Sequence, residues 1–317
     1  MDFVGKRNWY FLLSFVVALV GVVSLLLPGN LRAGIEFTGG STMTLEFQEE
    51  VGQEQLRSQL AALGHPDAII QGMGDSTFFI RTRTLKEAQP GEQSALSEKE
   101  TILNTLEANL GPMVGAPNFF SVSPTIATET VRNAIIAVVV ASVAILLYIT
   151  WAFRRVPSPF RYGVTAVVAL VHDVVVVLGM FSLFGRFFNF EVNAMFISAV
   201  LTIIGYSVHD TIVVFDRIRE NISRGVGRNL DSTVNISIQE TLGRSLNTSL
   251  TLLFTILALL LFGGATIRDF LVVLLVGIIA GTYSSICIAS QLLLVWENGD
   301  IGKLFRRRSR PARVQGG

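Results

Sequence analysis

Six long apolar stretches constrain this chain more than any other feature of its sequence. The first runs from about Trp9 to Leu27, and five more follow after a break of about one hundred residues, at about 134–153, 162–184, 192–215, 245–262 and 270–296. Each reaches the length of a helix that crosses a bilayer, about 20 residues. Half of the residues are apolar and only 15% are charged, so we predict a polytopic α-helical membrane protein with one helix followed by five.

The first apolar stretch is expected to remain in the protein as a transmembrane helix. A cleaved signal peptide is the alternative. The stretch is longer than the apolar region of such a peptide, and Leu31-Arg32-Ala33 is a poor cleavage site. Residues 1–28 are therefore predicted to form a cytoplasmic amino terminus and the first transmembrane helix.

Residues 29–130 have the composition of a soluble domain, because residues 30–129 hold 13 Asp and Glu against 6 Lys and Arg. Apolar–polar alternation predicts strands, and apolar residues three or four apart predict helices. The resulting order, β-α-β-β-α-β, is that of a ferredoxin-like α+β domain, the split βαβ unit. Its elements are expected at 41–47, 53–63, 68–71, 77–82, 97–110 and 118–122, with a turn at 72–75 and a loop at 89–94.

Basic residues are concentrated on one side of this six-helix plan. That side holds 16 of the 25 Lys and Arg, whereas the short loops on the other side hold only Arg186 and Arg268. The positive-inside rule then places both termini in the cytoplasm and the 29–130 domain outside. Residues 131–297 form the predicted five-helix bundle, and 298–317 a basic cytoplasmic tail. We interpret Arg306–Arg313 as a topology anchor that contacts anionic lipid, rather than as a nucleic-acid contact.

Ionisable residues inside the apolar stretches are the candidate functional groups, because a charge within a bilayer is costly. His172 and Asp173 lie in the third predicted span, and His209 and Asp210 in the fourth. Two polar stripes are expected to face each other inside the bundle, which puts Asp210 and Arg244 at matching depth. The first stripe is Thr202, Tyr206, His209 and Asp210, and the second is Arg244, Asn247, Thr248, Thr251 and Thr255.

The residues alone leave two interpretations of Asp210 and Arg244 open. They could form a static ion pair that braces the helices, although burial offsets much of the attraction in such a pair. Alternatively, Asp210 alternates between its charged and neutral forms as part of a proton relay. Arg244 could also be a simple anchor at the start of its helix. For His172 and Asp173, a relay and a hydrogen-bonded helix contact are equally open.

Other chemistries fit the sequence less well. Neighbouring His and Asp residues on a helix point about 100° apart, so each pair offers a metal only one good ligand. The two aspartates lack the Gly-x-Gly-Asp context of an intramembrane aspartyl protease dyad. The single Cys287 excludes a disulfide framework and a cysteine-based zinc site. No phosphate-binding loop is present, so we expect no ATP hydrolysis by this chain, which leaves an ion gradient as the natural energy source. We also expect no enzyme activity of its own, no metal and no cofactor, with protons as the coupling ion.

Several motifs carry a family resemblance that covers the whole chain. Gly34-Ile-Glu-Phe-Thr-Gly-Gly40 follows the first helix, and Gly205–Asn221 covers the fourth; Leu183–Gly185, Arg244–Thr248 and Leu261–Gly264 also fit. These resemble the motifs of the SecD/SecF family of protein-export membrane proteins, of the resistance–nodulation–division superfamily. The signature residues are Gly34, Glu36, Phe37, Gly39 and Gly40. Glu36 stands where the family usually has Asp, and His209 where it usually has Asn.

The resemblance implies a subunit of the Sec protein-export machinery that uses the proton-motive force, together with SecD, to promote preprotein translocation. It matches Asp210 to the proton-relay aspartate and Arg244 to the arginine that works with it. His209, Asp173 and His172 are secondary relay candidates. The implied partners are SecD, the SecYEG translocon, SecA and YajC, with an unfolded preprotein as substrate, membrane lipid and no nucleic acid. The implied location is the bacterial inner membrane.

Two alternative functions remain. The chain could be a stand-alone or homodimeric proton-driven exporter of the same superfamily, or a translocon scaffold that conducts no protons. A distinct six-helix partner would argue against the first alternative. Dependence of export on a proton gradient would argue against the second.

Overall fold

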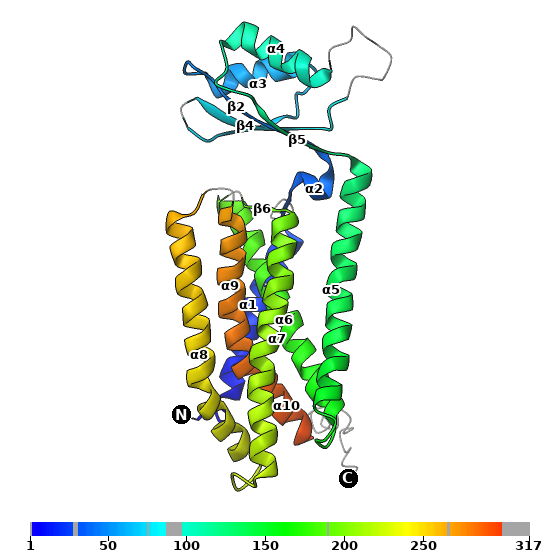
Figure 1. The fold of residues 1–317 in the computed structure, drawn as a ribbon, viewed down its shortest axis with the longest axis vertical. Coiled ribbons are helices and arrows are strands. Elements are labelled where there is room, and N and C mark those ends of the chain that lie inside the picture. The colour runs from blue at the N-terminus through cyan, green and yellow to red at the C-terminus, as the bar shows by residue number, and fades with distance from the viewer. Residues whose placement is uncertain are drawn as a thin grey trace, which may run out of the picture. The chain divides into compact units, whose positions relative to one another are not determined.

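The computed structural model describes residues 2–27, 31–74, 76–86, 97–188, 190–264 and 267–299. The chain folds as two compact units, drawn in Figure 1. One unit combines Met1–Arg32 with Ile136–Gly317, and we call it the membrane unit; the other is Ala33–Ile135, the α/β unit. The predicted loop at 89–94 and the basic run Arg306–Arg313 lie outside the described residues.

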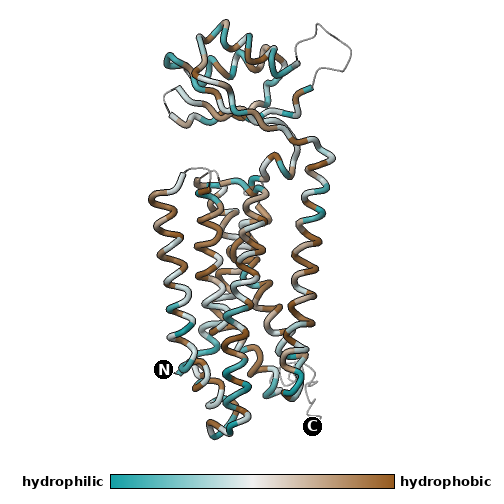
Figure 2. Tube along the Cα trace, viewed as in Figure 1, coloured by the Kyte–Doolittle hydropathy of each residue, from teal (hydrophilic) through white to brown (hydrophobic). Residues whose placement is uncertain are grey.

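Six helices of the described residues are long and apolar enough to cross a membrane, which confirms the predicted number of spans. They are α1 (Arg7–Leu26), α5 (Pro124–Ala152), α6 (Pro159–Phe188), α7 (Ala194–Ser223), α8 (Leu230–Phe262) and a last helix over Arg268–Glu297. The last helix consists of α9 (Arg268–Ser284), a π-helical turn at Ser285–Ala289 and α10 (Ser290–Glu297). Figure 2 shows that hydrophobic residues dominate these helices.

Two of the spans begin well before their apolar stretches. Helix α5 begins at Pro124, where proline is favourable because the first N–H of a helix has no intrahelical partner. Helix α8 follows the cap residue Asn229, whose side chain accepts a hydrogen bond from the Ser232 N–H at 2.9 Å. The Ser232 hydroxyl in turn accepts from the Asn229 N–H at 3.3 Å. Local capping, rather than hydropathy, therefore sets where these helices start.

Small residues let α1 and α6 approach each other closely. A Cβ atom added to Gly179 would lie 2.3 Å from the Cα atom of Gly21. Near this crossing, the hydroxyls of Ser24 and Ser182 are 2.8 Å apart. Lipid tails are as apolar as the helix surfaces, so association of these helices depends on close packing and interhelical hydrogen bonds.

Replacing Gly179 by alanine is expected to destabilise the membrane unit, because the added methyl group meets the backbone of α1. Overpacking of this kind costs about 1–3 kcal/mol. The measurement is the unfolding temperature of the purified protein in detergent. Gly243→Ala is the matched control, since nothing lies within 4 Å of a Cβ atom there. Equal unfolding temperatures for the two variants would contradict the packing argument.

The α/β unit has the predicted β-α-β-β-α-β order. Its elements are β2 (Gly40–Glu46), α3 (Gln53–Ala62), β3 (Ile69–Gly72), β4 (Thr77–Thr82), α4 (Glu98–Leu110) and β5 (Asn118–Val122). The strands form one antiparallel sheet in the order β3-β4-β2-β5. A short helix, α2 (Ile35–Thr38), precedes the sheet, and β1 (Arg32–Ala33) and β6 (Glu191–Val192) are two-residue strands elsewhere.

Alternation along β2 and β4 builds the core of the α/β unit. Met43 faces Ile80 across the two strands, and Leu45 faces Phe78; all four side chains are buried. The helices add three buried leucines and one buried isoleucine at helical spacing: Leu56, Leu60, Ile102 and Leu106. Ser97, predicted as the first residue of this helix, is instead its cap and forms a capping box with Glu100.

Candidate functional site

Among the described residues of the membrane unit, two carboxylates are buried, Asp173 on α6 and Asp210 on α7. Their exposed fractions are 1% and 5%. Burying a carboxylate costs free energy unless hydrogen bonds or an opposite charge compensate. The partners of each carboxylate therefore indicate what it can do.

Asp173 is fully supplied with hydrogen-bond donors. Its Oδ2 accepts from the Ser207 hydroxyl of α7 at 2.6 Å and from the Ser284 hydroxyl of α9 at 2.7 Å. Its Oδ1 lies 3.1 Å from Nδ1 of the neighbouring His172. These bonds join α6, α7 and α9 at one point, so Asp173 has the contacts of a helix brace.

Only one of the two carboxylate oxygens of Asp210 has a hydrogen-bond donor among the described residues. Its Oδ1 accepts a hydrogen bond from the Ser245 hydroxyl of α8 at 2.5 Å. Its Oδ2 is buried and has no hydrogen-bond partner among the residues that the structure describes. A buried carboxylate oxygen without a donor can take up a proton or meet a cationic group. Asp210 therefore has an open position that Asp173 lacks.

The face of α8 that meets α7 differs from the predicted stripe. Ser245 bonds Asp210, and one turn later the Ser249 hydroxyl lies 2.8 Å from the Tyr206 hydroxyl. Arg244 is exposed, and no ion pair joins it to Asp210 within the described part of the chain. Neighbouring helix positions point about 100° apart. Ser245 therefore faces Asp210, while Arg244, one residue earlier, points away from it. In the structure Asp210 bonds Ser245 rather than Arg244, and the role of Arg244 beside Asp210 stays a prediction.

Both α7 and α8 expose polar residues on their outer faces. The exposed set is Thr202 and His209 on α7, and Arg244, Asn247, Thr248, Thr251 and Thr255 on α8. We call this set the outer polar face. Polar and charged side chains in a spanning helix usually face protein or water, because contact with hydrocarbon is costly. The outer polar face is thus suited to a contact other than lipid tails.

Ser207 connects the surroundings of the two carboxylates. Its hydroxyl donates to Asp173, and its carbonyl accepts from the hydroxyls of Thr211 at 3.0 Å and Ser285 at 3.2 Å. Thr211 directly follows Asp210, and Ser285 begins the π-helical turn. Single π-helical turns are frequent at functional sites. The network therefore runs from α6 through α7 to the irregular part of the last helix.

Sequence reasoning missed the serines that serve the carboxylates. Ser207, Ser245 and Ser284 were not among the predicted site residues, although each donates to a buried aspartate. One available signal was the adjacent pair Ser284-Ser285 inside a predicted transmembrane stretch. Another was the four-residue spacing of Ser245 and Ser249, which puts both on one face of a helix.

The end of α7 is held by ion pairs. Arg217 contacts Glu220 at 2.6 Å on its own helix and Glu240 of α8 at 2.7 Å. Asn221 also donates to Glu240, at 2.7 Å. This part of the Gly205–Asn221 motif therefore fixes α7 against α8 beyond the two carboxylates.

The Gly34–Gly40 motif forms the turn that leads into the sheet of the α/β unit. Gly39 and Gly40 have φ angles of 72° and 133°, which favour glycine. A Cβ atom on Gly40 would also lie 2.7 Å from the carbonyl oxygen of Thr82. Of the other motif residues, Gly34 is buried, and Glu36 and Phe37 are half-buried. The backbone conformation therefore explains why glycine stands at positions 39 and 40.

Replacing Gly40 by alanine is expected to weaken the start of β2, because the new side chain is strained and meets β4. Strain at such a backbone conformation costs about 1–3 kcal/mol. Amide hydrogen exchange of the full chain should show loss of protection in β2 and β4. Gly74→Ala is the control, since a Cβ atom there meets nothing within 4 Å. Unchanged protection in Gly40→Ala would show that the turn tolerates a side chain.

No group of three or more His, Cys, Asp or Glu side chains within the described ranges is arranged to hold a metal ion. The candidate site consists instead of Asp210 with its open oxygen, the hydrogen-bonded Asp173 and the outer polar face. Together with the α/β unit between the first and second spans, these features define a polytopic helical membrane protein with carboxylates inside its bundle.

Comparison with known proteins identifies the family. Residues 102–299 match the family described as "Protein export membrane protein SecD/SecF, C-terminal". The protein translocase subunit SecF of Thermobaculum terrenum is 45% identical over 97% of this chain and 97% of its own length. The SecF of Anaerolinea thermophila is 37% identical over 98% of this chain and 99% of its own length. The chain belongs to the SecD/SecF family.

A solved structure has the same fold over most of the chain. The crystal structure of SecDF from Thermus thermophilus superimposes with a TM-score of 0.74 and 36% identity, over 94% of this chain. The match covers 39% of that SecDF chain. The protein translocase subunit SecDF of Bacillus subtilis is likewise matched over 39% of its length, at 33% identity. This chain therefore corresponds to one part of those longer proteins.

Proposed function

We propose that this chain works with a SecD-type partner as a subunit of the Sec protein translocation machinery, and that the pair uses the proton-motive force to promote translocation of preproteins. Asp210 is the proton-binding group in this proposal. The observation that carries it is the buried Oδ2 of Asp210, which has no hydrogen-bond partner among the described residues. This chain matches relatives named protein translocase subunit SecF over nearly their whole length, which supports the Sec part of the proposal.

The outer polar face supports a partner subunit. Arg244 and Asn247 on α8, and His209 on α7, are exposed in a unit whose surroundings would otherwise be hydrocarbon. In the SecDF relatives this chain matches only about two fifths of the protein, so a separate SecD-type chain is the natural counterpart of the rest. Such a partner would cover the outer polar face and exclude lipid from the surroundings of Asp210.

The distribution of charge supports an orientation. Most Lys and Arg lie on one side of the six spans. By the positive-inside rule, we therefore expect both termini on the cytoplasmic side of a bacterial inner membrane. The α/β unit, as a ferredoxin-like domain, is then extracytoplasmic, on the side where a translocated preprotein emerges. The SecYEG translocon, SecA and YajC are the further partners that this role implies, and the ATPase belongs to SecA rather than to this chain.

The mechanism follows from how a proton changes the Asp210 site. The charged carboxylate holds the Ser245 hydroxyl of α8, and a neutral carboxyl holds it less strongly. Protonation therefore loosens the contact between α7 and α8. A proton can shift such an element between two states only through its different affinity for them. Arg244 lies one residue from Ser245 and would meet Asp210, or an acid of the partner, in the other state.

Asp210→Asn is expected to abolish the gradient-driven part of export, because the amide keeps the shape of the side chain but cannot take up a proton. The measurement is preprotein translocation into membrane vesicles that contain the partner and the translocon, with and without an uncoupler. Asp216→Asn is the control on the same helix, where the carboxylate makes a surface ion pair with Arg219. If the uncoupler still lowered export by Asp210→Asn as much as in the parent protein, Asp210 would not be the proton site. Parent protein that is insensitive to the uncoupler would indicate a scaffold.

Arg244→Lys is expected to reduce gradient-driven export, because lysine keeps the charge but loses the planar, two-pronged contact with a carboxylate. Arg224→Lys is the matched control, since Arg224 makes an exposed ion pair with Glu220, one helical turn before it in the chain. The same vesicle assay reports both variants. Full activity in Arg244→Lys would indicate that Arg244 acts only as a positively charged anchor at the membrane surface.

A further inference from the structure

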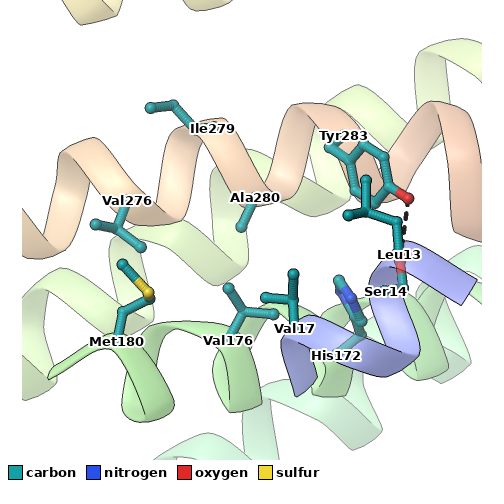
Figure 3. A pocket seen from close by; sticks show the side chains of 10 residues that line it. All are labelled: Leu13, Ser14, Val17, His172, Val176, Met180, Val276, Ile279, Ala280 and Tyr283. Atoms are coloured by element: carbon teal, nitrogen blue, oxygen red, sulfur yellow. Dashed lines mark hydrogen bonds between the residues drawn. The ribbon is translucent and has the colours of Figure 1, made fainter. Parts of the chain in front are cut away.

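An apolar pocket lies between α1, α6 and α9, away from the contacts of Asp210. Its volume is about 370 Å³, within the range of 300–1,000 Å³ typical of small-molecule sites. The lining residues are Leu13, Ser14 and Val17 of α1, His172, Val176 and Met180 of α6, and Val276, Ile279, Ala280 and Tyr283 of α9. Figure 3 shows the His172 ring pointing into the pocket beside α1.

Most polar atoms around the pocket already have partners. The Ser14 hydroxyl donates to the Tyr283 hydroxyl at 3.2 Å, and the Tyr283 hydroxyl donates to the Tyr10 carbonyl at 2.8 Å. His172 Nδ1 lies 3.1 Å from Asp173 Oδ1. His172 Nε2 differs: it is buried and has no hydrogen-bond partner within the described residues.

The surroundings of Asp173 define what His172 Nε2 can do. Because Asp173 accepts two serine hydroxyls at Oδ2, it acts as a carboxylate acceptor towards His172 as well. We therefore assign the ring proton to Nδ1, which donates to Asp173, and a neutral ring then presents Nε2 as an acceptor. The pocket combines apolar walls with one unfilled hydrogen-bond acceptor.

Water fits this pocket poorly. A buried water molecule needs two to four polar partners, and His172 Nε2 is the one buried polar atom lining this pocket that lacks a partner among the described residues. Leu13 and Ile279 on the pocket wall are each 54% exposed, on helices that are long and apolar enough to cross a membrane. The pocket is thus reached from the bilayer, whose own molecules are its natural ligands.

We propose that this pocket binds a membrane-dissolved alcohol: an apolar chain or ring system with one hydroxyl group, which donates its hydrogen bond to His172 Nε2. The apolar body fills the space between α1, α6 and α9. The hydroxyl completes a chain from the ligand through His172 and Asp173 to Ser207 and Ser284. The ligand would thereby stabilise the junction of α6, α7 and α9, next to the π-helical turn.

The test is photolabelling of the full chain in phosphatidylcholine vesicles by 1-hexadecanol that carries a diazirine. Labelled residues are expected on α1, α6 and α9 around the pocket. Unlabelled 1-hexadecanol should compete about fivefold better than its methyl ether, the effect of one hydrogen bond of about 1 kcal/mol. Equal competition by the alcohol and the ether would overturn the role of His172 Nε2.

Ala280→Leu separates a pocket from ordinary lipid contact, because the larger side chain fills the cavity and leaves His172 in place. Labelling of α1 and α6 should be lost in Ala280→Leu. Ala258→Leu, the same change on an exposed part of α8, should label like the parent protein. Equal labelling of the two variants would show binding of annular lipid only and would overturn the proposal.

His172→Phe tests the acceptor directly, and competition identifies the source of the ligand. His172→Phe should remove the advantage of the alcohol over its ether; a retained advantage would overturn the proposal. A diacylglycerol and a long-chain phenol, added separately as competitors, distinguish a lipid alcohol from a phenolic or quinol headgroup. Failure of every hydroxyl compound to compete would also overturn it. None of these measurements depends on export, so their outcome is independent of the proton-relay assignment.

Discussion

Two carboxylates lie buried among the apolar helices of the membrane unit. Burial of each charge costs free energy, which hydrogen-bond donors from neighbouring helices must offset. Asp173 meets this need with two serine hydroxyls and an imidazole from its own and two other helices. Asp210 meets it only in part, through Ser245. The first arrangement suits a brace, and the second suits a group that changes its charge. The two aspartates of this helix bundle therefore differ in how many of their carboxylate oxygens have hydrogen-bond partners.

Close helix packing makes these contacts possible. A Cβ atom on Gly281 of α9 would lie 3.0 Å from the Ser207 Cβ atom of α7, so the two helices come near enough for Ser284 and Ser207 to share one carboxylate oxygen. The π-helical turn begins at the following residue, Ser285. Single π-helical turns are frequent at functional sites, and this one adjoins the hydrogen bonds of Asp173.

Sequence and structure agree best where one periodic pattern suffices. The spans follow from length and hydropathy, and the sheet of the α/β unit follows from alternation such as that of Met43 and Leu45. They disagree at α8, where the sequence favours Arg244 as the partner of Asp210 and the structure supplies Ser245. The polar stripe and the serine stripe differ by one position, which hydropathy cannot resolve because both are compatible with a spanning helix.

By itself, the sequence determined six spans, an α/β unit after the first of them and the presence of costly ionisable groups in the bundle. Those properties depend on chain length, periodicity and residue type, which are local. Only the tertiary structure decided which carboxylate is satisfied, that Arg244 is exposed, and that His172 reaches an apolar pocket. Each of these depends on the rotation of one helix against another, and that rotation is set by packing among residues far apart in the chain.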